Sequence, residues 1–352
     1  MSKIIIHPVG LLNLSRVNLK KKKKYYKNNN ESLYNTCYIN SSIQCLFRLN
    51  GFINKILYSN GKELTEATNK LINAMMCKKN KSKNLRVLEI KQAMAKIYEK
   101  YKDNNPEDAN EFISNYLNAL HEENMNKNSS FDFSIIQISD NDKENFMNFF
   151  KKFYGKKGES FIFDIFYGIL RTESYCPKCK YQFSVKFNAY NILEIPIYDL
   201  IHNNNEVLNM NQILKQYISP KEVEHSDCSI CQIDTYIKTE FFTFPKCLII
   251  YFERNDEKKY IDNDINILET INLDKYLYNP SKNSSKYNYT LKGVIYYDDL
   301  GDNLGHYTAT CLIEDKWYHF DDNEIYEQEN LNNINDYEKP VLLFYEKEKE
   351  KE

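Results

Sequence analysis

Apolar side chains recur at helical spacing directly after Cys37, and this is the first element that the pattern predicts. The positions that share one face are Ile39, Ile43, Leu46 and Phe47. Residues three and four apart lie on the same side of a helix, so the spacing predicts an amphipathic helix that begins near Cys37. Gly51 is a residue at which such a helix can end. The pattern therefore places a cysteine in the first turn of a helix.

A second amphipathic helix is predicted after residue 105. Its apolar positions are Phe112, Ile113, Tyr116, Leu117 and Leu120. Asn105 is a suitable N-cap, and Pro106 suits the first helical position because its missing N–H would have no partner there. We therefore expect this helix to begin near Pro106, with acidic side chains in its first turn.

From about residue 160 the pattern changes to runs of β-branched and aromatic residues bounded by turn residues. These runs lie at 161–163, 241–242, 248–252, 289–297, 307–313 and 341–345. Runs of this kind favour β-strands. We therefore expect an α+β fold, in which a helical N-terminal lobe and a β-rich C-terminal lobe leave a cleft between them.

Composition and charge narrow the class of protein. The chain has 352 residues, 42% of them hydrophobic, which is enough for one large domain or for two or three smaller ones. A net charge of −2 argues against a dedicated nucleic-acid binder. No apolar run reaches the length that spans a membrane. The basic run 20–24 follows the first apolar stretch, opposite to a signal peptide, and is either a solvated surface run or a nuclear localisation signal.

The cysteine count fits a reducing compartment, so we expect a cytoplasmic and/or nuclear protein. Nine is an odd number, and most of the cysteines stand singly in apolar surroundings, so they are better interpreted as thiols and metal ligands than as disulfides. The cysteine at the helix start has two interpretations. Backbone N–H groups there would stabilise a thiolate, which is the nucleophilic form. A buried structural cysteine explains the same pattern.

His306 and Asp321 lie in a pattern that would place them beside each other. His306 starts an apolar run after the loop 298–303, and Asp321 ends the next run. A turn at 314–316 would pair the two strands antiparallel and bring a carboxylate to one imidazole nitrogen, leaving the other nitrogen for Cys37. The alternative is an ordinary strand that starts at His306 and a turn at 321–322.

Several segments resemble the ubiquitin-specific proteases, which are papain-like deubiquitinases. The run around Cys37 and the segments 305–307 and 317–322 are similar to the cysteine and histidine boxes of that family. Further similar segments follow in family order, and the resemblance spans about residues 31 to 346; they lie at 108–112, 166–168, 248–254 and 340–345.

The resemblance implies a papain-like cysteine protease with a helical thumb, a β-rich palm and zinc-ribbon fingers. The implied boundaries are an N-terminal extension at 1–30, a catalytic domain at 31–346 with thumb 31–158, fingers 159–245 and palm 246–346, and a charged tail at 347–352.

By the same resemblance, Cys37 is the nucleophile, His306 the general base and acid, and Asp321 the residue that orients the imidazole, with Asp322 as the alternative third member. The implied reaction is hydrolysis after the C-terminal glycine of ubiquitin through a thioester on Cys37. The implied partners are ubiquitin and ubiquitinated proteins; we expect a monomer with no nucleic-acid or membrane partner. The alternatives are an impaired ubiquitin-binding scaffold and a protease for another modifier with a Gly-Gly tail.

Two positions before the nucleophile depart from the family pattern. Relatives commonly have glycine where this chain has Tyr34, and glycine alone adopts positive φ freely. They also place an asparagine five residues before the cysteine, to stabilise the oxyanion, where this chain has Ser32. A hydroxyl donates a hydrogen bond with a shorter reach than an amide. Ser32 is therefore a weak candidate for an oxyanion donor, beside the backbone N–H of Cys37.

Two Cys-x2-Cys pairs predict a structural zinc site. The four thiols are Cys176, Cys179, Cys228 and Cys231. Each pair can present two thiolates to one Zn²⁺, and four such ligands close a tetrahedron. A redox pair or unpaired thiols are the alternatives, and His225 is a substitute ligand that the complete set leaves unnecessary.

Asp108 and Glu111 are three residues apart and share one helix face. Acids in a first turn complement the helix dipole, which is one explanation of both. The resemblance implies a second, in which these carboxylates, with Asn110 nearby, receive the arginines of the ubiquitin tail Leu-Arg-Leu-Arg-Gly-Gly. The two explanations are compatible.

Overall fold

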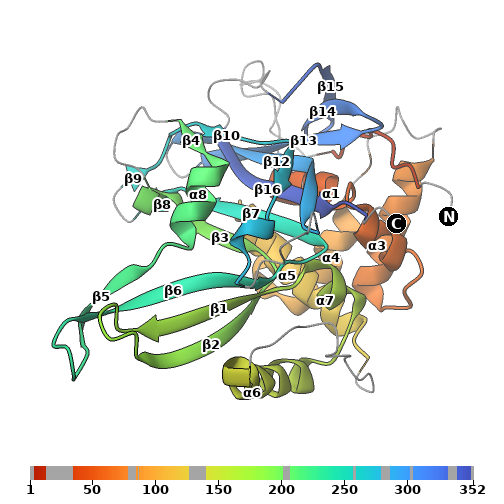
Figure 1. Ribbon diagram of the computed structural model, residues 1–352. Coiled ribbons are helices and arrows are strands. Elements are labelled where there is room, and N and C mark those ends of the chain that lie inside the picture. The colour runs from red at the N-terminus through yellow and green to blue at the C-terminus, as the bar shows by residue number, and fades with distance from the viewer. Residues whose placement is uncertain are drawn as a thin grey trace. The chain divides into compact units, whose positions relative to one another are not determined.

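The computed structural model describes residues 4–12, 35–77, 85, 87–126, 140–200, 207–256, 259–278, 286–301, 304–331 and 339–349 (Figure 1). The chain divides into two compact units. Unit 1 comprises residues 1–124 and 291–345, and unit 2 comprises residues 125–290 and 346–352. Unit 1 thus joins the first third of the sequence to residues 291–345, and unit 2 consists of the middle of the sequence and residues 346–352.

Unit 1 combines helices from the first third of the chain with strands from the last. Its helices are α1 Cys37–Leu46, α2 Asn50–Ile56, α3 Glu63–Met76, α4 Leu88–Ile97 and α5 Ala109–Glu123, with a 3-10 turn at Glu99–Lys102. Its strands are β12 Asn288–Gly301, which starts at the unit boundary, β13 Leu304–Ile313, β14 Lys316–Asp321, β15 Glu324–Gln328 and β16 Lys339–Lys347. They lie in the order β15-β14-β13-β12-β16.

The predicted helix after Cys37 is α1, and every one of its residues is buried. It packs against β13, where the sulfurs of Cys45 and Cys311 lie 3.7 Å apart. The close packing leaves no room for a side chain at Gly293 in β12, because a Cβ there would lie 2.8 Å from the Cys45 sulfur. The nucleophile candidate therefore starts a helix that is held firmly against the sheet.

Unit 2 contains a four-stranded antiparallel sheet in the order β2-β1-β6-β5. These strands are β1 Gly168–Tyr175, β2 Gln182–Tyr190, β5 Lys221–Asp227 and β6 Asp234–Thr243. The helices are α6 Asp140–Lys157, α7 Phe161–Phe166 and α8 Met210–Tyr217. The remaining elements are β3 Leu193–Pro196, a 3-10 turn at Ile197–Leu200, β4 Leu208–Asn209, β7 Cys247–Glu253, β8 Asn255–Asp256, β9 Lys259–Tyr260, β10 Ile265–Asn266, β11 Thr270–Asn272 and a 3-10 turn at Asp274–Tyr276.

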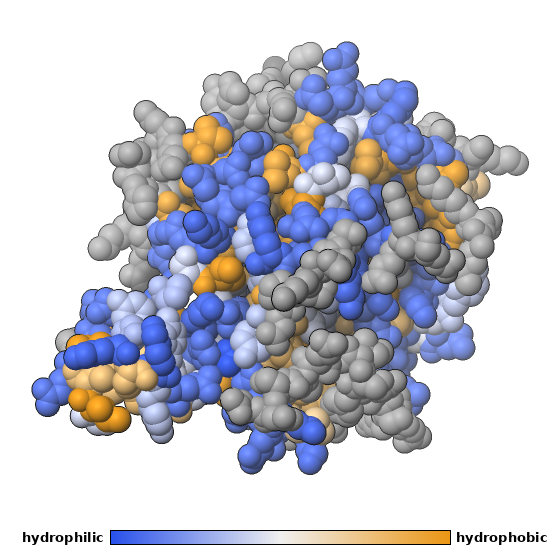
Figure 2. All heavy atoms as spheres, in the orientation of Figure 1, coloured by the Kyte–Doolittle hydropathy of each residue, from blue (hydrophilic) through white to orange (hydrophobic). Residues whose placement is uncertain are grey.

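The four-stranded sheet carries exposed apolar side chains toward its far end. Figure 2 shows hydrophobic side chains gathered there on the visible face. Tyr181 and Ile230 are 58% and 75% exposed, and Phe183 packs edge-on against Tyr181. Exposed apolar clusters of this kind are common at protein interaction surfaces.

Four sequence expectations about local structure were wrong. Gly51 was expected as the residue at which the helix of Cys37 ends, but α1 ends at Leu46 and Gly51 lies inside α2, which starts at Asn50. The helix predicted to begin at Pro106 begins at Ala109, because the side chain of Asp108 accepts the N–H of Glu111 and caps it there. The run 161–163 lies in helix α7, where Ser160 accepts the N–H of Phe163 as N-cap. Residues 298–301 were expected in a loop, but they continue β12 and pair with β13. The other predicted strand runs all lie in strands.

In the described part of the chain, no helix is both long enough and apolar enough to cross a bilayer.

Candidate active site and metal centre

Cys37 is the first residue of α1, and its side chain is buried. The first N–H groups of an α-helix have no partner within the helix, and Cys37 lies in this first turn. The Sγ atom of Cys37 lies 3.5 Å from the side-chain oxygen of Asn35. The thiol therefore sits at the positive end of a helix, as the sequence predicted.

The predicted hairpin is present and brings His306 to Asp321. Strands β13 and β14 pair antiparallel, with Ala309 opposite Phe320, and the turn is made by Glu314 and Asp315 at φ of 48° and 66°. The Nε2 atom of His306 lies 2.7 Å from Oδ1 of Asp321. The nearest carboxylate oxygen of Asp322 is 4.0 Å from the same nitrogen. Asp321 is thus the hydrogen-bonding partner of the imidazole.

The environment of His306 favours its protonated form. Burial lowers the pKa of His306, but the hydrogen bond to Asp321 and the contact with Cys37 raise it more, to about 10. The imidazole therefore lies between a carboxylate and a thiol and carries a proton at neutral pH. This is the arrangement of nucleophile, base and orienting acid that covalent catalysis requires.

Asp322 is held from the other side by Asn40, a residue that the sequence analysis did not single out. The Asn40 amide donates to Oδ1 of Asp322 at 2.9 Å. Asn40 lies one turn after Cys37 in α1, so the helix that carries the thiol also binds the turn after β14. A polar residue in a helix that is buried throughout is the signal that could have identified it.

The acidic residues before α5 form a cluster linked to the strand of His306. One carboxylate oxygen of Asp108 caps α5, and the other accepts the hydroxyl of Tyr307 at 3.1 Å. Burial, and secondly the Asp108 carboxylate, hold the pKa of Tyr307 well above its ordinary value, so the hydroxyl stays a donor. Asp108 is therefore fixed next to the catalytic histidine candidate along β13.

Lys100 bridges two further acids of this cluster. Its ammonium group lies 2.8 Å from Glu107 and also pairs with Glu111. Glu107 was missed by the sequence analysis, although it stands directly before Asp108. The cluster thus offers three carboxylates, and the single ammonium group of Lys100, which pairs with two of them, leaves a net negative charge.

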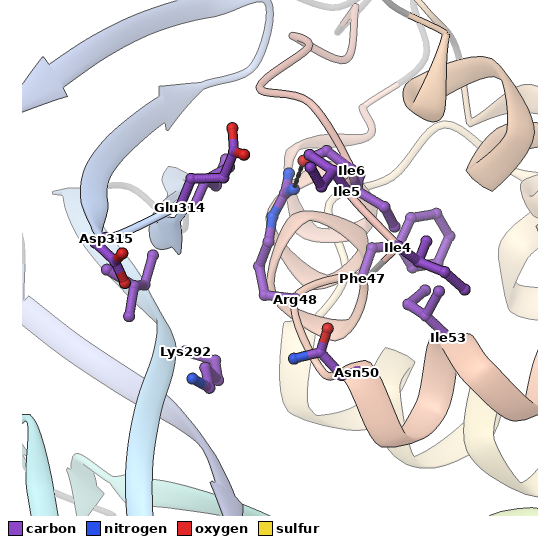
Figure 3. Close-up of a pocket in the computed structure, with 12 residues that line it drawn as sticks. Ile4, Ile5, Ile6, Phe47, Arg48, Asn50, Ile53, Lys292, Glu314 and Asp315 are labelled. Atoms are coloured by element: carbon purple, nitrogen blue, oxygen red, sulfur yellow. Dashed lines mark hydrogen bonds between the residues drawn. The ribbon is translucent and has the colours of Figure 1, made fainter. Parts of the chain in front are cut away.

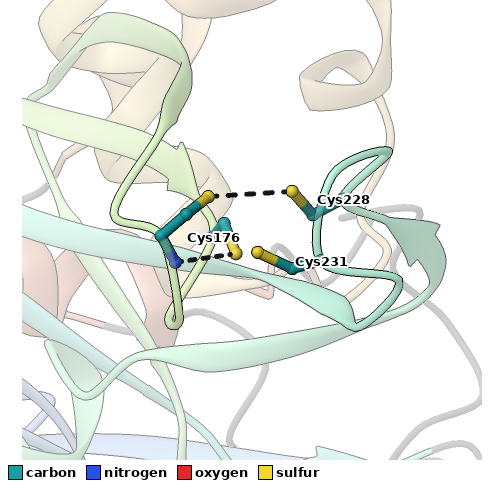
Figure 4. A group of neighbouring side chains, drawn as sticks. Cys176, Cys228 and Cys231 are labelled. Carbon is teal, nitrogen blue, oxygen red and sulfur yellow. Dashed lines mark hydrogen bonds between the residues drawn. The ribbon is translucent and has the colours of Figure 1, made fainter.

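The four predicted zinc ligands converge in unit 2 (Figure 4). The first pair lies between β1 and β2, and the second lies between β5 and β6. The sulfurs of Cys179 and Cys228 are 3.8 Å apart, and all four sulfurs lie within 4.8 Å of one another. In this predicted set, each thiol faces the other three.

The two cysteine pairs have the same backbone conformation. The residues that follow the second cysteine of each pair, Lys180 and Gln232, have φ of 62° and 49°. Their N–H groups donate to the carbonyls of Cys176 and Cys228 at 2.9 and 2.8 Å. Two matched loops that aim four sulfurs at one point suit a tetrahedral metal ion.

The sulfurs of this set affect the pKa values of one another in both directions. Burial and the sulfurs of Cys179 and Cys176 raise the pKa of Cys231 to about 12. Burial acts in the same direction on Cys176, but backbone N–H groups of Cys179 and Lys178 lower its pKa to about 6. A bound divalent cation would stabilise all four thiolates together.

Other residues that the sequence singled out cannot be placed. Ser32 and Tyr34 lie outside the described residues, as does the basic run 20–24. The side chain of His225 also lies outside them.

Comparison with known proteins identifies the relatives of this chain. A family model described as ubiquitin carboxyl-terminal hydrolase matches residues 28–345. Usp2 of Drosophila melanogaster is 27% identical over 334 residues, and the match covers 89% of this chain and 34% of that protein. The probable ubiquitin carboxyl-terminal hydrolase 4 of Schizosaccharomyces pombe is 24% identical over 351 residues, covering 90% and 58%. The chain thus spans less than two thirds of the length of these relatives.

Solved structures show the same fold. The SAGA deubiquitinating module, in which a Ubp8 variant is assembled with Sgf11, Sus1 and Sgf73 and bound to monoubiquitin, contains a chain that superposes with a TM-score of 0.69 at 17% identity. That match covers 99% of this chain and 71% of the other. A ubiquitin aldehyde complex of the module gives the same TM-score. The likeness confirms the predicted fold class, an α+β papain-like cysteine protease.

Proposed function

Since the chain belongs to the ubiquitin carboxyl-terminal hydrolase family, we propose that it is a cysteine-type deubiquitinase that hydrolyses the bond after the C-terminal glycine of ubiquitin. The observation that carries the proposal is the set formed by Cys37, His306 and Asp321. A buried thiol at a helix start touches an imidazole whose other side is bound to a carboxylate at 2.7 Å. No other chemistry uses this set as directly as acyl transfer through a thioester.

In the proposed reaction, the Cys37 sulfur attacks the carbonyl carbon of the terminal glycine, and His306 holds the proton of the thiol. The bond to the leaving amine then breaks, and His306 gives that amine its proton. A thioester remains on Cys37. Water attacks the thioester with His306 as general base, which releases the glycine carboxylate and returns the thiol. Asp321 keeps the imidazole oriented through both steps.

The oxyanion of each tetrahedral intermediate needs hydrogen-bond donors. The backbone N–H of Cys37 lies in the first turn of α1, where it has no intrahelical partner. We propose it as one donor and retain Ser32 as a weak second candidate. Losing one such donor typically costs roughly 2.7–4 kcal/mol of transition-state stabilisation.

The acidic cluster supplies the proposed recognition of the ubiquitin tail. Asp108 and Glu111 would bind the tail arginines, and Glu107 adds a third carboxylate to the same surface. Arginine forks pair well with carboxylates. Lys100 pairs with both Glu107 and Glu111 but carries only one positive charge, so the three carboxylates keep a net negative charge that would attract a cationic substrate segment.

A structural zinc ion is the proposed cofactor. Cys176, Cys179, Cys228 and Cys231 would hold it, and the ion would cross-link the two hairpins of the four-stranded sheet. None of the nine cysteines forms a disulfide, which fits the proposed placement of the protein in a reducing compartment, the cytoplasm or nucleus.

A ubiquitin probe with a C-terminal electrophile tests the proposed function. We expect one covalent adduct per chain, lost in Cys37→Ala and retained in Cys77→Ala, which removes an exposed cysteine outside the site. The adduct must also be resistant to reducing agent when the electrophile forms a thioether. Matched probes built on other Gly-Gly-tailed modifiers, such as SUMO- and NEDD8-like proteins, should react more slowly. Tight ubiquitin binding without an adduct would instead identify a scaffold.

A further inference from the structure

The segment of residues 4–12, here called the N-terminal strap, packs into unit 1 although it precedes the nucleophile by more than twenty positions. Its side chains at Ile6, Val9 and Leu11 are buried. It is bound by three side chains of α1 and its C-terminal end that recur every four residues. These are Asn40, Gln44 and Arg48. Residues four apart lie on one helix face, so these three side chains form a row of hydrogen-bond donors along α1 and its C-terminal end.

Each of these three side chains donates a hydrogen bond to a different backbone carbonyl of the strap. Arg48 donates to Ile6 at 2.6 Å, and Figure 3 shows this bond with Ile4 and Ile5 beside it. Gln44 donates to the carbonyl of Val9 at 2.7 Å, and its own oxygen accepts from Arg48 at 2.8 Å. Asn40 donates to the carbonyl of Leu11 at 3.1 Å. Asn40, Gln44 and Arg48 are buried, so water cannot reach their polar groups. The hydrogen bonds to the strap therefore satisfy donors that would otherwise have no partner.

The end of the strap contacts the turn that follows Asp321. The N–H of Leu11 donates to the carbonyl of Asp322 at 3.0 Å. Gly10 lies so close to the same turn that an added Cβ would be 2.4 Å from the carbonyl oxygen of Asn323. Asp322 itself has φ of 55°, in the left-handed region that non-glycine residues adopt infrequently and Asp more readily than most.

Asn40 links the N-terminal strap to the turn after Asp321. Its amide binds both the strap, at Leu11, and the side chain of Asp322. The turn after Asp321 is therefore hydrogen-bonded to the strap backbone through Leu11 and to the helix of Cys37 through Asn40. We expect the distance between the Cys37 thiol and the Asp321 carboxylate to depend on both sets of hydrogen bonds.

We propose that the N-terminal strap and Asn40 are positioning elements that hold the Asp321–Asp322 turn in register with Cys37, so that His306 is oriented for proton transfer. This inference rests on the proposed function, because it assigns the role through Asp321. Residues 13–34 separate the strap from α1 in the sequence, so the strap is placed by its own bonds and not by direct attachment to the nucleophile. A separate peptide should therefore be able to replace it.

Paired truncations test the proposal. One variant lacks residues 1–12, and its control lacks residues 1–3, which leaves every bond of the strap in place. Both are assayed on ubiquitin with a fluorogenic C-terminal amide. The loss of residues 1–12 should lower kcat about tenfold or more and leave KM within about twofold, because the tail-binding cluster is untouched. A synthetic peptide of residues 4–12, added in excess, should restore kcat.

A point variant covers the case in which the truncated protein does not fold. Gly10→Ala should displace the turn and lower kcat about tenfold at unchanged KM. Its matched control is Gly61→Ala, also in unit 1, where the added Cβ would meet the side chain of Thr65 and not the turn. The control should keep its kcat while showing a comparable shift in thermal unfolding. Unchanged kcat in Gly10→Ala, or equal kcat losses in the two variants, would overturn the proposal.

Alkylation of Cys37 by iodoacetamide separates this inference from the proposed function. The rate is followed at Cys37 by peptide mass spectrometry and needs no ubiquitin. The strap truncation and Gly10→Ala should slow it at least fivefold at neutral pH, since a misplaced Asp321 weakens the support of His306 for the thiolate. If the wild type does not react with ubiquitin but the two variants still show this slowing, the proposed function fails and the strap inference stands. If Cys37 is alkylated at the same rate in the wild type and in these variants, the strap inference fails and the proposed function is unaffected.

Discussion

At the scale of single residues, Asp108 serves structure and proposed recognition with different parts of one carboxyl group. One oxygen caps α5 and the other accepts the hydroxyl of Tyr307, the neighbour of His306. The negative charge is not required to cap the helix, because an amide oxygen accepts the same N–H. It is needed for a cationic ligand. The two roles can therefore be separated by a substitution that keeps a capping oxygen and removes the charge.

Asp108→Asn should weaken ubiquitin cleavage through KM, with a rise of about five- to twentyfold, since a charge-assisted arginine contact is lost. The melting temperature should remain near that of the wild type, because Asn caps helices about as well as Asp. Steady-state kinetics and thermal unfolding measure the two effects. The control is Asp108→Ala, which should also lose about 1 kcal/mol of stability with the cap. Unchanged KM in the Asn variant would contradict the recognition role.

At the scale of elements, the two cysteine hairpins of unit 2 show how a repeated local geometry builds a site. Each pair is followed by a residue at positive φ whose N–H returns to the carbonyl of the first cysteine. Each first cysteine also donates its N–H across the base of its loop, to Tyr181 in one case and to Ile233 in the other. Two loops of this kind, on two strand pairs of one sheet, orient four sulfurs toward one another.

Purified protein should contain about one zinc ion per chain, as measured by elemental analysis. Cys228→Ser should lose the ion and unfold at a lower temperature, because the hairpins would then lose their cross-link. Cys77→Ser is the matched control, since Cys77 is exposed and lies far from the set in the sequence. Folded wild-type protein that contains no zinc after gentle purification would refute the metal site.

At the scale of the whole molecule, each proposed chemistry lies inside one unit. Cys37, His306 and Asp321 all belong to unit 1, although they come from opposite ends of the sequence, and the four zinc-site cysteines all belong to unit 2. Protonation of the proposed catalytic groups should therefore change the unfolding free energy of unit 1. Within the proposed site, His306 governs the pH dependence, and it faces Cys37 of α1, Asp321 at the end of β14 and Asp322 in the turn that follows.

The stabilising contribution of His306 should decline at alkaline pH. Its pKa of about 10 in the folded protein exceeds the ordinary value of about 6.5 expected when unfolded. A group with a raised folded pKa stabilises fully below its unfolded pKa and loses that effect as pH rises through the folded value. The difference in unfolding free energy between wild type and His306→Gln should thus shrink between about pH 6.5 and 10. Denaturant titrations that find a constant difference would exclude this protonation state.

Local patterns predicted the elements well where one signal dominated and poorly where two competed. The face of Ile39, Ile43 and Leu46 predicted the start and the buried side of α1 correctly, whereas the stop signal at Gly51 was wrong because that residue lies in the next helix. Pro106 competed with Asp108 for the start of α5, and the residue that could hydrogen-bond the free N–H groups prevailed. The aromatic run at 161–163 favoured a strand by composition, but the cap at Ser160 and burial in unit 2 made it helical.

The amino-acid sequence by itself determined which residues have the chemistry: a thiol at a helix start, a histidine and an aspartate on two strands joined by a tight turn, and four cysteines in two pairs. These depend on residue type and short-range spacing, which the sequence displays directly. Only the tertiary structure decided which groups meet. Asn40 contacts Asp322 across 282 positions, Tyr307 reaches Asp108 across 199, and the strap lies along α1. Such contacts arise from the packing of distant segments, so no local pattern encodes them.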